Sequence, residues 1–418
     1  MATQQPFRRF FAELGPGLIT GAADDDPSGV STYSVVGATF GYIPLWTALF
    51  SFPLMASVQL MCARLGVVTG LGLAGVIRRR YSRRVLWSSC ALLALANVIN
   101  IAADLGGMAD ATRMVTGAPV ALMVPVFGIG IVGLLMWSSY RAIARVFKWL
   151  TLVLLAYVLT AFVAHVDWRA AITATLIPHI VWSRAFFSVL VAILGTTISP
   201  YLFFWQAAQE VEEERARGRN LAHRRGATCE ELRACRNDVV TGMFASNLIM
   251  FFIIMTAAAT LHAHGKTDIG TAQEAAEALR PLAGNGAYWL FTLGLIGTGM
   301  LAVPVLAGSC AYAIAEASAW RGSLNRRPGR AKQFYVVLTV AMALGIALNY
   351  FGLDAIKLLF TSAVINGVLA PPLILIVVLL TSDRAVMGDA VNSRQLAGLG
   401  WLTFIVMVGA SLGLIFAA

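Results

Sequence analysis

The sequence predicts an all-α polytopic membrane protein, and three observations support this prediction. First, 58% of the 418 residues are hydrophobic and only 12% are charged, whereas a soluble domain carries about 25% charged residues. Second, the mean hydropathy is +0.75, which leaves too little polar surface to cover a globule. Third, the apolar residues form runs long enough to cross a bilayer, since a spanning helix needs about 20 residues. We therefore expect a single transmembrane domain over residues 1–418.

Hydropathy and loop composition predict eleven membrane-spanning helices. Their expected ranges are 12–41, 44–70, 85–115, 118–140, 147–166, 185–209, 237–262, 287–319, 333–351, 354–381 and 395–417. The longest polar stretch, 210–236, is too short to bury a core of its own, so no catalytic domain is expected outside the membrane. The net charge of +10 does not indicate nucleic-acid binding, because the basic residues lie in short loops between apolar runs.

The distribution of basic residues predicts how the chain is oriented. Lys and Arg accumulate in cytoplasmic loops. In this chain they cluster on the side of the N-terminal tail, at Arg8, Arg9, Arg78, Arg79, Arg80, Arg83, Arg84, Arg141, Arg145, Lys148, the seven arginines between 215 and 236, Arg321, Arg326, Arg327, Arg330, Lys332, Arg384 and Arg394. We expect a cytoplasmic N-terminus, an external C-terminus and a place in the cell (inner) membrane.

The first span carries a charged interruption at its centre. Residues 24–29 read Asp-Asp-Asp-Pro-Ser-Gly, and one charged side chain at mid-membrane costs roughly 2.5–3.5 kcal/mol on insertion scales. Pro27 lacks an N–H and Gly29 tolerates any φ, so the helix should break here and free carbonyl oxygens. Together with the Ser28 hydroxyl, these are the oxygen ligands that hard cations prefer. The alternative is a kinked helix whose acids lie in a turn outside the bilayer.

A second interruption lies in the sixth span. Residues 196–201 read Thr-Thr-Ile-Ser-Pro-Tyr, so a proline again follows a small hydroxyl residue inside an apolar run. Such a sequence alone is typical of a simple kink, but here it lies five spans after the first break. Interrupted helices at corresponding positions of two halves indicate an inverted-repeat transporter. We expect repeat one over about 12–166, repeat two over about 185–381, and an extra helix over about 395–417.

Three segments resemble the NRAMP family of divalent-metal transporters. The first span is similar to the metal-binding helix of that family, where Asp-Pro-Gly-Asn follows a Gly-Pro-Gly start. Ala63–Leu71 matches the second span of the family closely, and Thr381–Gly388 resembles the loop after its tenth span. The resemblance implies a LeuT-like fold with five plus five helices, an eleventh helix, and breaks in spans one and six. It also implies a monomeric secondary transporter that moves divalent cations by alternating access, without a cofactor and without enzymatic activity.

The chain departs from the family at the implied metal site. The family aspartate falls on Asp26, and its asparagine falls on Gly29, which has no side chain to coordinate. The sixth-span pattern Ala-x-x-Met-Pro-His falls on 196–201, so its methionine becomes Ser199 and its histidine becomes Tyr201. Thioether ligands select softer metals, whereas hydroxyl, carboxylate and water suit magnesium, calcium or manganese. The site resembles that of the magnesium-transporting relatives, and we expect Mg²⁺ and/or Mn²⁺ as substrate.

Asp26 is the expected central ligand, with Asp25, the Thr196 carbonyl and Ser199 close to the ion. Further residues expected to line the site or support it are Asp24, Ser28, Gly29, Tyr201, Asp104, Asn366 and Gln206. Asn366 has an alternative role in a hydrogen bond between helices.

Protons are not expected to accompany the metal. In the third span the acidic pair of the family falls on Asp104 and Gly107, and the family histidine falls on Tyr201. Neither glycine nor tyrosine titrates near neutral pH, so transport without proton coupling is expected. Asp104, Asp24 and Asp25 remain as groups that could substitute.

Two other classes of function stay open at this point. A carrier of amino acids or other small organic solutes on the same fold would usually present uncharged, glycine-rich breaks, and three aspartates would repel a carboxylate. An intramembrane aspartyl enzyme would need a second catalytic aspartate on a neighbouring helix, for which Asp104 is the candidate.

Overall fold

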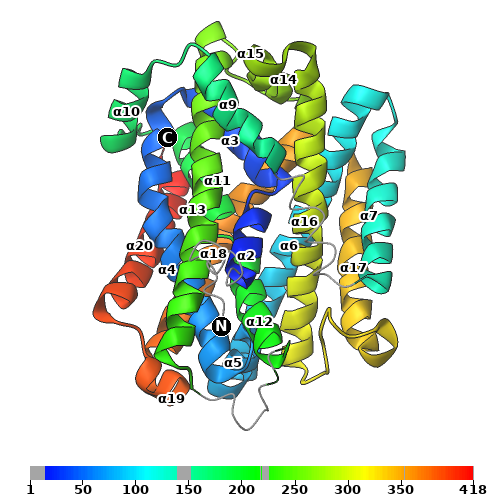
Figure 1. Ribbon diagram of the computed structural model, residues 1–418, viewed down its shortest axis with the longest axis vertical. Helices are drawn as coiled ribbons and strands as arrows, with labels where there is room; N and C mark the ends of the chain where they lie inside the picture. The colour runs from blue at the N-terminus through cyan, green and yellow to red at the C-terminus, as the bar shows by residue number, and fades with distance from the viewer. Residues whose placement is uncertain (1–14, 139–151, 217, 219–225, 353, 418) are drawn as a thin grey trace, which may run out of the picture.

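The computed structural model describes residues 15–138, 152–216, 218, 226–352 and 354–417, and all its regular secondary structure in these ranges is helical (Figure 1). The longer helices are α2 (Pro16–Asp24), α3 (Pro27–Phe40), α4 (Trp46–Thr69), α6 (Arg83–Thr116), α7 (Val120–Trp137), α9 (Leu155–Val163), α10 (Trp168–Leu176), α11 (Arg184–Thr197), α12 (Pro200–Ala216), α13 (Cys229–Thr260), α16 (Ala287–Ala317), α17 (Lys332–Leu348), α18 (Ala355–Ser382) and α20 (Arg394–Phe416).

Short helices connect the long ones at the two ends of the bundle. The short α-helices are α5 (Leu73–Arg80), α14 (Ala272–Ala276), α15 (Arg280–Ala283) and α19 (Arg384–Met387). Short 3₁₀ turns are η1 (Ile43–Leu45), η2 (Leu152–Leu154), η4 (His262–His264), η5 (Glu277–Leu279), η6 (Gly284–Gly286), η7 (Pro328–Arg330), η8 (Asn349–Phe351) and η9 (Gly388–Ala390). In Figure 1, α5 and α19 lie at the lower end, and α10, α14 and α15 lie at the upper end. The short helices α5, α14, α15 and α19 and helix α10 fall in segments that hydropathy predicts to be loops.

Nine helices of the described residues are long and apolar enough to span a membrane, and ten if one bent pair counts as a single span. The bent pair is Leu152–Val163 with Trp168–Leu176, and the chain bends by 119° between these two helices. It corresponds to the expected fifth span at 147–166, of which 147–151 lie outside the described residues. The first expected span, 12–41, is not among the ten, because every membrane-length stretch of its described residues contains the three acids of the break. The predicted all-α membrane architecture is confirmed.

The broken helices lie at the centre of the bundle and the unbroken peripheral ones face outward. In Figure 1, α2, α3, α11 and α18 occupy the middle, whereas α7 and α17 lie at one edge and α20 at the other. The most apolar part of the sixth span, 184–216, is 94% buried inside the protein, against 22% for α7 and 28% for α20. Large apolar side chains such as Ile129 and Ile405 are exposed on these outer helices, as expected for surfaces that contact lipid.

Helix α2 packs against α13 with almost no side chain between them. A Cβ on Gly242 would lie 2.2 Å from the Gly17 carbonyl oxygen, and a Cβ on Gly21 would lie 2.2 Å from the Gly242 carbonyl oxygen. Helix α11 approaches α18 in the same way, because a Cβ on Gly195 would lie 2.0 Å from the Ala363 carbonyl oxygen. Small residues allow helix backbones to approach closely inside membranes, and here they bring each first half-helix against a long neighbour.

The segments Ala63–Leu71 and Thr381–Gly388, which resemble family motifs, lie side by side at the lower end. Hydrogen bonds from these segments and the residues next to them join this region. Arg64 Nη2 donates to the Ala390 carbonyl at 2.8 Å, and Arg80 Nε donates to Asp383 Oδ2 at 2.6 Å. The Arg80 guanidinium, through this hydrogen bond and its charge, holds the pKa of the half-buried Asp383 carboxyl below its ordinary value.

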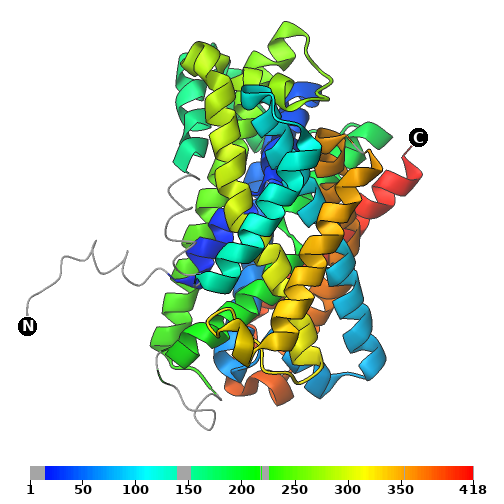
Figure 2. The same cartoon turned by 90° about the vertical axis from the view of Figure 1, so that its right-hand side faces the viewer.

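Basic residues gather at this same end, which carries α5 with Arg78, Arg79 and Arg80 and the start of α19 at Arg384 (Figure 2). Several of the clustered residues lie outside the described ranges, namely Arg8, Arg9, Arg141, Arg145, Lys148, Arg217, Arg219, Arg224 and Arg225.

Candidate functional site

The first break, between α2 and α3, holds Asp26 in a fixed position. Asp26 is the N-cap of α3, with φ −70° and ψ 170°, and its Oδ1 accepts a hydrogen bond from the Gly29 backbone N–H at 2.7 Å. Pro27 occupies the first helical position, where a missing N–H removes no hydrogen bond. The other carboxylate oxygen, Oδ2, accepts from the Tyr201 hydroxyl at 3.4 Å. Because a helix N-terminus carries a partial positive charge, the backbone favours an anion at this position.

The second break, between α11 and α12, presents neutral oxygen atoms. Helix α12 begins at Pro200, and the Ser199 hydroxyl lies 2.7 Å from both the Gly195 and the Thr196 carbonyl oxygens, to which it donates. These carbonyls belong to the last turn of α11, where the backbone offers no further N–H partners. The Thr196 hydroxyl donates to Tyr33 Oη at 3.1 Å, which connects this break to α3. Carbonyl and hydroxyl oxygens therefore meet here without a formal charge.

The remaining two acids of the first break face a different helix. The Ser246 hydroxyl of α13 lies 2.7 Å from Asp24 Oδ2 and 3.1 Å from Asp25 Oδ1, and it can donate its one proton to either. The hydrogen bonds thus divide the acids into two groups, with Asp26 at Tyr201 and the other two at Ser246. All three side chains are buried, with exposures of 1% for Asp24, 5% for Asp25 and 4% for Asp26.

Helices α6 and α18 contribute further polar groups next to α3. Asp104 Oδ1 accepts from the Ser28 backbone N–H at 3.2 Å, while its Oδ2 is buried without a hydrogen-bond partner among the described residues. The Ser28 hydroxyl donates to the Leu359 carbonyl at 3.2 Å and lies 3.2 Å from the Ser362 hydroxyl. The buried Asn366 lies on the same helix, two turns from Leu359, and its Oδ1 also has no partner in this part of the chain. The fold therefore brings Asp104 next to the first break, while its role at the site stays a prediction.

Gln206 is engaged in contacts between helices. Its Oε1 accepts from the Thr20 hydroxyl at 2.5 Å, and its Nε2 donates to Glu210 Oε1 at 2.9 Å. These bonds join α2 to α12 beyond the break. Within the described residues, no three Asp, Glu, His or Cys side chains converge with the geometry of a metal site. An ion at the breaks would therefore be held by few carboxylates, with backbone, hydroxyl or water oxygens completing its coordination.

Comparison with known proteins places this chain in a family. The family model for natural resistance-associated macrophage protein-like (Nramp) proteins matches residues 17–417. The chain belongs to the Nramp family. It is 28% identical over 422 residues to the divalent metal cation transporter MntH of Yersinia pestis, and the alignment covers 97% of this chain and 95% of that protein.

Solved structures support the fold of this Nramp-family protein. The manganese transporter of Eremococcus coleocola aligns with a TM-score of 0.77 at 21% identity, over 99% of this chain and 88% of that one. Mhp1, a nucleobase-cation-symport-1 family transporter, aligns with a TM-score of 0.60 at 14% identity, over 97% and 91% of the two chains. The expected LeuT-like architecture is thereby confirmed, whereas the repeat boundaries at 12–166 and 185–381 stay a prediction.

Three residues that contact the first span were missed by reasoning from the sequence. Ser246 and Ser362 are single hydroxyl residues inside apolar spans, where nothing in the sequence distinguishes them from packing residues. Asp238 accepts hydrogen bonds from the backbone N–H groups of Gly15 at 2.8 Å, Gly17 at 2.6 Å and Leu18 at 3.2 Å. An acid at the start of the seventh span was the available signal for this contact, because carboxylates stabilise helix N-termini.

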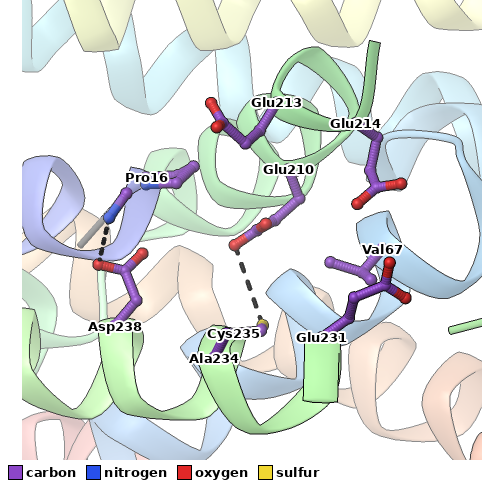
Figure 3. A pocket seen from close by; sticks show the side chains of 10 residues that line it. Pro16, Val67, Glu210, Glu213, Glu214, Glu231, Ala234, Cys235 and Asp238 are labelled. Atoms are coloured by element: carbon purple, nitrogen blue, oxygen red, sulfur yellow. Dashed lines mark hydrogen bonds between the residues drawn. The ribbon is translucent and has the colours of Figure 1, made fainter. Parts of the chain in front are cut away.

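An acidic pocket lies beside this contact, between the start of α2 and helices α12 and α13 (Figure 3). Its acidic lining consists of Glu210, Glu213, Glu214, Glu231 and Asp238. The Cys235 thiol of α13 donates to Glu210 Oε1 at 3.9 Å. Through Glu210 and Gln206 the pocket is connected by hydrogen bonds to Thr20 in the middle of α2.

Proposed function

We propose that this Nramp-family protein is a secondary transporter that carries divalent metal cations by alternating access. The observation that supports this most directly is the environment of the Asp26 carboxylate. Its carboxylate is buried at a helix break, is oriented by the Gly29 N–H, and forms no ion pair with a basic side chain of the described residues. A buried charge is normally paired or coordinates a metal. The transport activities named for MntH and for the Eremococcus coleocola protein agree with a divalent cation as substrate.

The proposed ligand set joins the two breaks. Asp26 is the central ligand, and the Thr196 carbonyl and the Ser199 hydroxyl supply neutral oxygens. Asp25 is adjacent in the chain and adds negative charge. Asp104, which binds the Ser28 N–H through one oxygen, has its second oxygen free of hydrogen bonds within the described structure. Opposite charges attract most strongly where water is scarce, so these acids define where the cation rests.

The proposed substrate is a hard ion, Mg²⁺ and/or Mn²⁺, that keeps part of its hydration shell. No thioether lies at the second break, where Ser199 offers a hydroxyl. Gly29 adds no ligand, and Mg²⁺ is typically bound through one or two carboxylates while retaining several waters. The absence of a three-carboxylate cluster in the described residues agrees with such a partly hydrated ion.

Transport is proposed to be uncoupled from protons. The family histidine is replaced by Tyr201, whose hydroxyl binds the Ala23 carbonyl at 2.9 Å and Asp26 at 3.4 Å. At Gly107, a Cβ would lie 2.8 Å from Leu359 Cδ1, so this position is packed against an apolar side chain. A divalent cation would then enter down its own gradient and the membrane potential, which is worth about 2.3 kcal/mol per charge per 100 mV.

The proposed orientation places the basic end of the bundle in the cytoplasm, in the cell (inner) membrane. Arg78, Arg79 and Arg80 of α5 lie at that end, and basic residues concentrate on the cytoplasmic side. The N-terminus would then be cytoplasmic and the C-terminus external, and the monomer would contain the whole path.

Liposome uptake tests the function, the substrate and the coupling together. Purified protein is reconstituted, and entry of Mg²⁺, Mn²⁺ and Ca²⁺ is followed with and without a pH gradient, alongside a pH-sensitive dye inside the vesicles. We expect saturable entry of Mg²⁺ or Mn²⁺ that leaves the internal pH unchanged. Acidification that follows metal entry and disappears in Asp104→Asn would overturn the uncoupled mechanism. No entry of any divalent ion would favour an organic-solute carrier instead.

A further inference from the structure

We propose that Asp24, Asp25 and Ser246 form a second divalent-cation site, adjacent to Asp26 on the same permeation path. The inference rests on the proposed function, because it concerns a second position for the same substrate. The hydrogen-bond geometry motivates it: the two acids turn toward Ser246 of α13, whereas Asp26 turns toward Gly29 and Tyr201.

The helix dipoles act differently on the acids around the first break. Asp26 lies at the N-terminus of α3, and Asp238 lies against the N-terminus of α2, so both acids face a partial positive charge. Asp24 is the last residue of α2, and Asp25 is its C-cap. A helix C-terminus carries a partial negative charge and several unpaired carbonyl oxygens. The backbone therefore opposes the charge of these two acids instead of stabilising it.

The two carboxylates have too few hydrogen-bond donors around them. A serine hydroxyl has a single proton, yet Ser246 Oγ lies within hydrogen-bond distance of carboxylate oxygens of both Asp24 and Asp25. Asp24 Oδ1 is buried and accepts no hydrogen bond in the described structure, although the residue is only 1% exposed. Burying a charged group without a partner is costly. At least one carboxylate oxygen therefore remains available to a further ligand.

A hard divalent cation is the ligand that fits these two acids. Within the described residues, no lysine, arginine or histidine forms an ion pair with either acid, so a bound cation would supply the compensating charge. Two carboxylates, one hydroxyl and the carbonyls at the end of α2 are all oxygen donors, which hard divalent cations prefer. The Asp24 carbonyl oxygen lies 3.3 Å from where a Cβ on Gly29 would stand, so the second site adjoins the first.

An ion would occupy the two proposed cation sites one after the other. The pair at Ser246 attracts an ion with two carboxylates and with the partial negative charge at the C-terminus of α2, and the neighbouring Asp26, which the Gly29 N–H holds in place, offers the next carboxylate. Repulsion between ions at adjacent sites makes departure easier, as in other multi-site conduction paths. The second site should therefore raise occupancy at low ion concentration without being indispensable for translocation.

The test is the stoichiometry of Mn²⁺ binding to the purified full-length chain, measured by titration calorimetry. We expect Asp24→Asn to bind one Mn²⁺ fewer than the unmodified protein, and Asp26→Asn also to bind one fewer. Ser246→Ala keeps both carboxylates, so it should retain the full number of ions with a several-fold change in the affinity of one. Glu213→Gln, in the acidic pocket, is the matched control for ions bound outside this site and should not alter the Asp24-dependent ion.

Uptake measurements separate this inference from the function on which it rests. Asp24→Asn should raise KM for Mn²⁺ about tenfold while changing the maximal rate by less than about twofold, because only ion capture is weakened. If Asp24→Asn and Ser246→Ala bind and transport like the unmodified protein while Asp26→Asn does neither, the second site is refuted and the proposed function stands. If the unmodified protein binds neither Mn²⁺ nor Mg²⁺, the proposed function itself fails. Should Asp24→Asn not fold, equal Mn²⁺ affinities in Ser246→Ala and the unmodified protein would refute the site.

Discussion

The two helix breaks share a backbone design but differ in charge. Each half-helix that follows a break, α3 or α12, begins at a proline, at Pro27 or Pro200. At the first break the residue before the proline is Asp26, whose side chain caps the new helix. At the second break it is Ser199, whose hydroxyl turns back to the carbonyls of the preceding helix.

This difference shows how one architecture can divide the tasks of binding. In the proposed function, the first break supplies the charge that attracts a cation, and the second supplies the neutral oxygens that surround it. The charge is also anchored by backbone N–H groups, so that Asp26 holds its position without an ionic partner. We therefore expect substitutions at the first break to affect whether an ion binds, and those at the second to affect which ion binds.

The largest expected effect separates the breaks by charge. Asp26→Asn preserves an N-cap side chain but removes the anion, and we expect Mn²⁺ uptake into liposomes to fall about 100-fold or more because the main attraction is lost. Ser199→Ala, the matched change at the other break, should leave uptake within about fivefold, since one neutral ligand can be replaced by water. Equal losses in the two variants would show that the breaks contribute alike.

A second prediction concerns the glycine contacts beside each break. Gly242→Ala and Gly195→Ala would place a Cβ 2.2 Å from the Gly17 oxygen and 2.0 Å from the Ala363 oxygen. Each should lower stability by about 1–3 kcal/mol because backbone must move. Melting curves in detergent measure this, with Gly130→Ala as the control, because nothing lies within 4 Å of its Cβ. A melting temperature unchanged in Gly242→Ala would mean that α2 adjusts freely.

A third, smaller effect tests how the first break is held from outside. Asp238 accepts three backbone N–H groups at the start of α2, so Asp238→Ala should destabilise the docked helix by about 1–2 kcal/mol. Hydrogen exchange should rise in residues 15–24 and stay constant in α11, the corresponding half-helix of the other break. Equal exchange in both half-helices would contradict a local role for Asp238.

The smallest expected effect is a change of selectivity at the second break. Ser199→Met introduces a thioether, which favours softer metals, and it should raise Cd²⁺ uptake relative to Mg²⁺ by about three- to tenfold, or roughly 1 kcal/mol. Competition between the two ions in the uptake assay measures the ratio. Much tighter binding of Cd²⁺ than Mg²⁺ by the unmodified protein would contradict a hard site.

Hydropathy and the proline positions are local signals, and they were sufficient for most of the spans and for both breaks. The sequence also pointed to Asp26 and Asp104, because ionisable residues inside apolar spans are rare. It did not reveal that Asp24 and Asp25 both contact Ser246, because that residue lies more than 200 residues away in the chain. A side chain that looks like packing in sequence becomes a ligand partner only through the tertiary contact.

The expected fifth span illustrates the same limit for the fold. Its described part ends at Val163, and the chain then turns by 119° into α10. Hydropathy reports only how apolar a segment is, and a bend of this kind depends on the neighbours that the two helices contact. The short helices α5, α14, α15 and α19 were missed because helices of one or two turns are stabilised by packing more than by their own sequence.

The contact between α2 and α13 has a consequence for the speed of movement. Gly17 and Gly242 bring the two backbones together where the helices cross, so no side-chain rotamer has to change at that point. The side-chain hydrogen bonds that hold α2 come from Asp238 and Ser246 of α13 and from Gln206 of α12. The rate at which α2 can move relative to α13 therefore depends on how fast these few hydrogen bonds break.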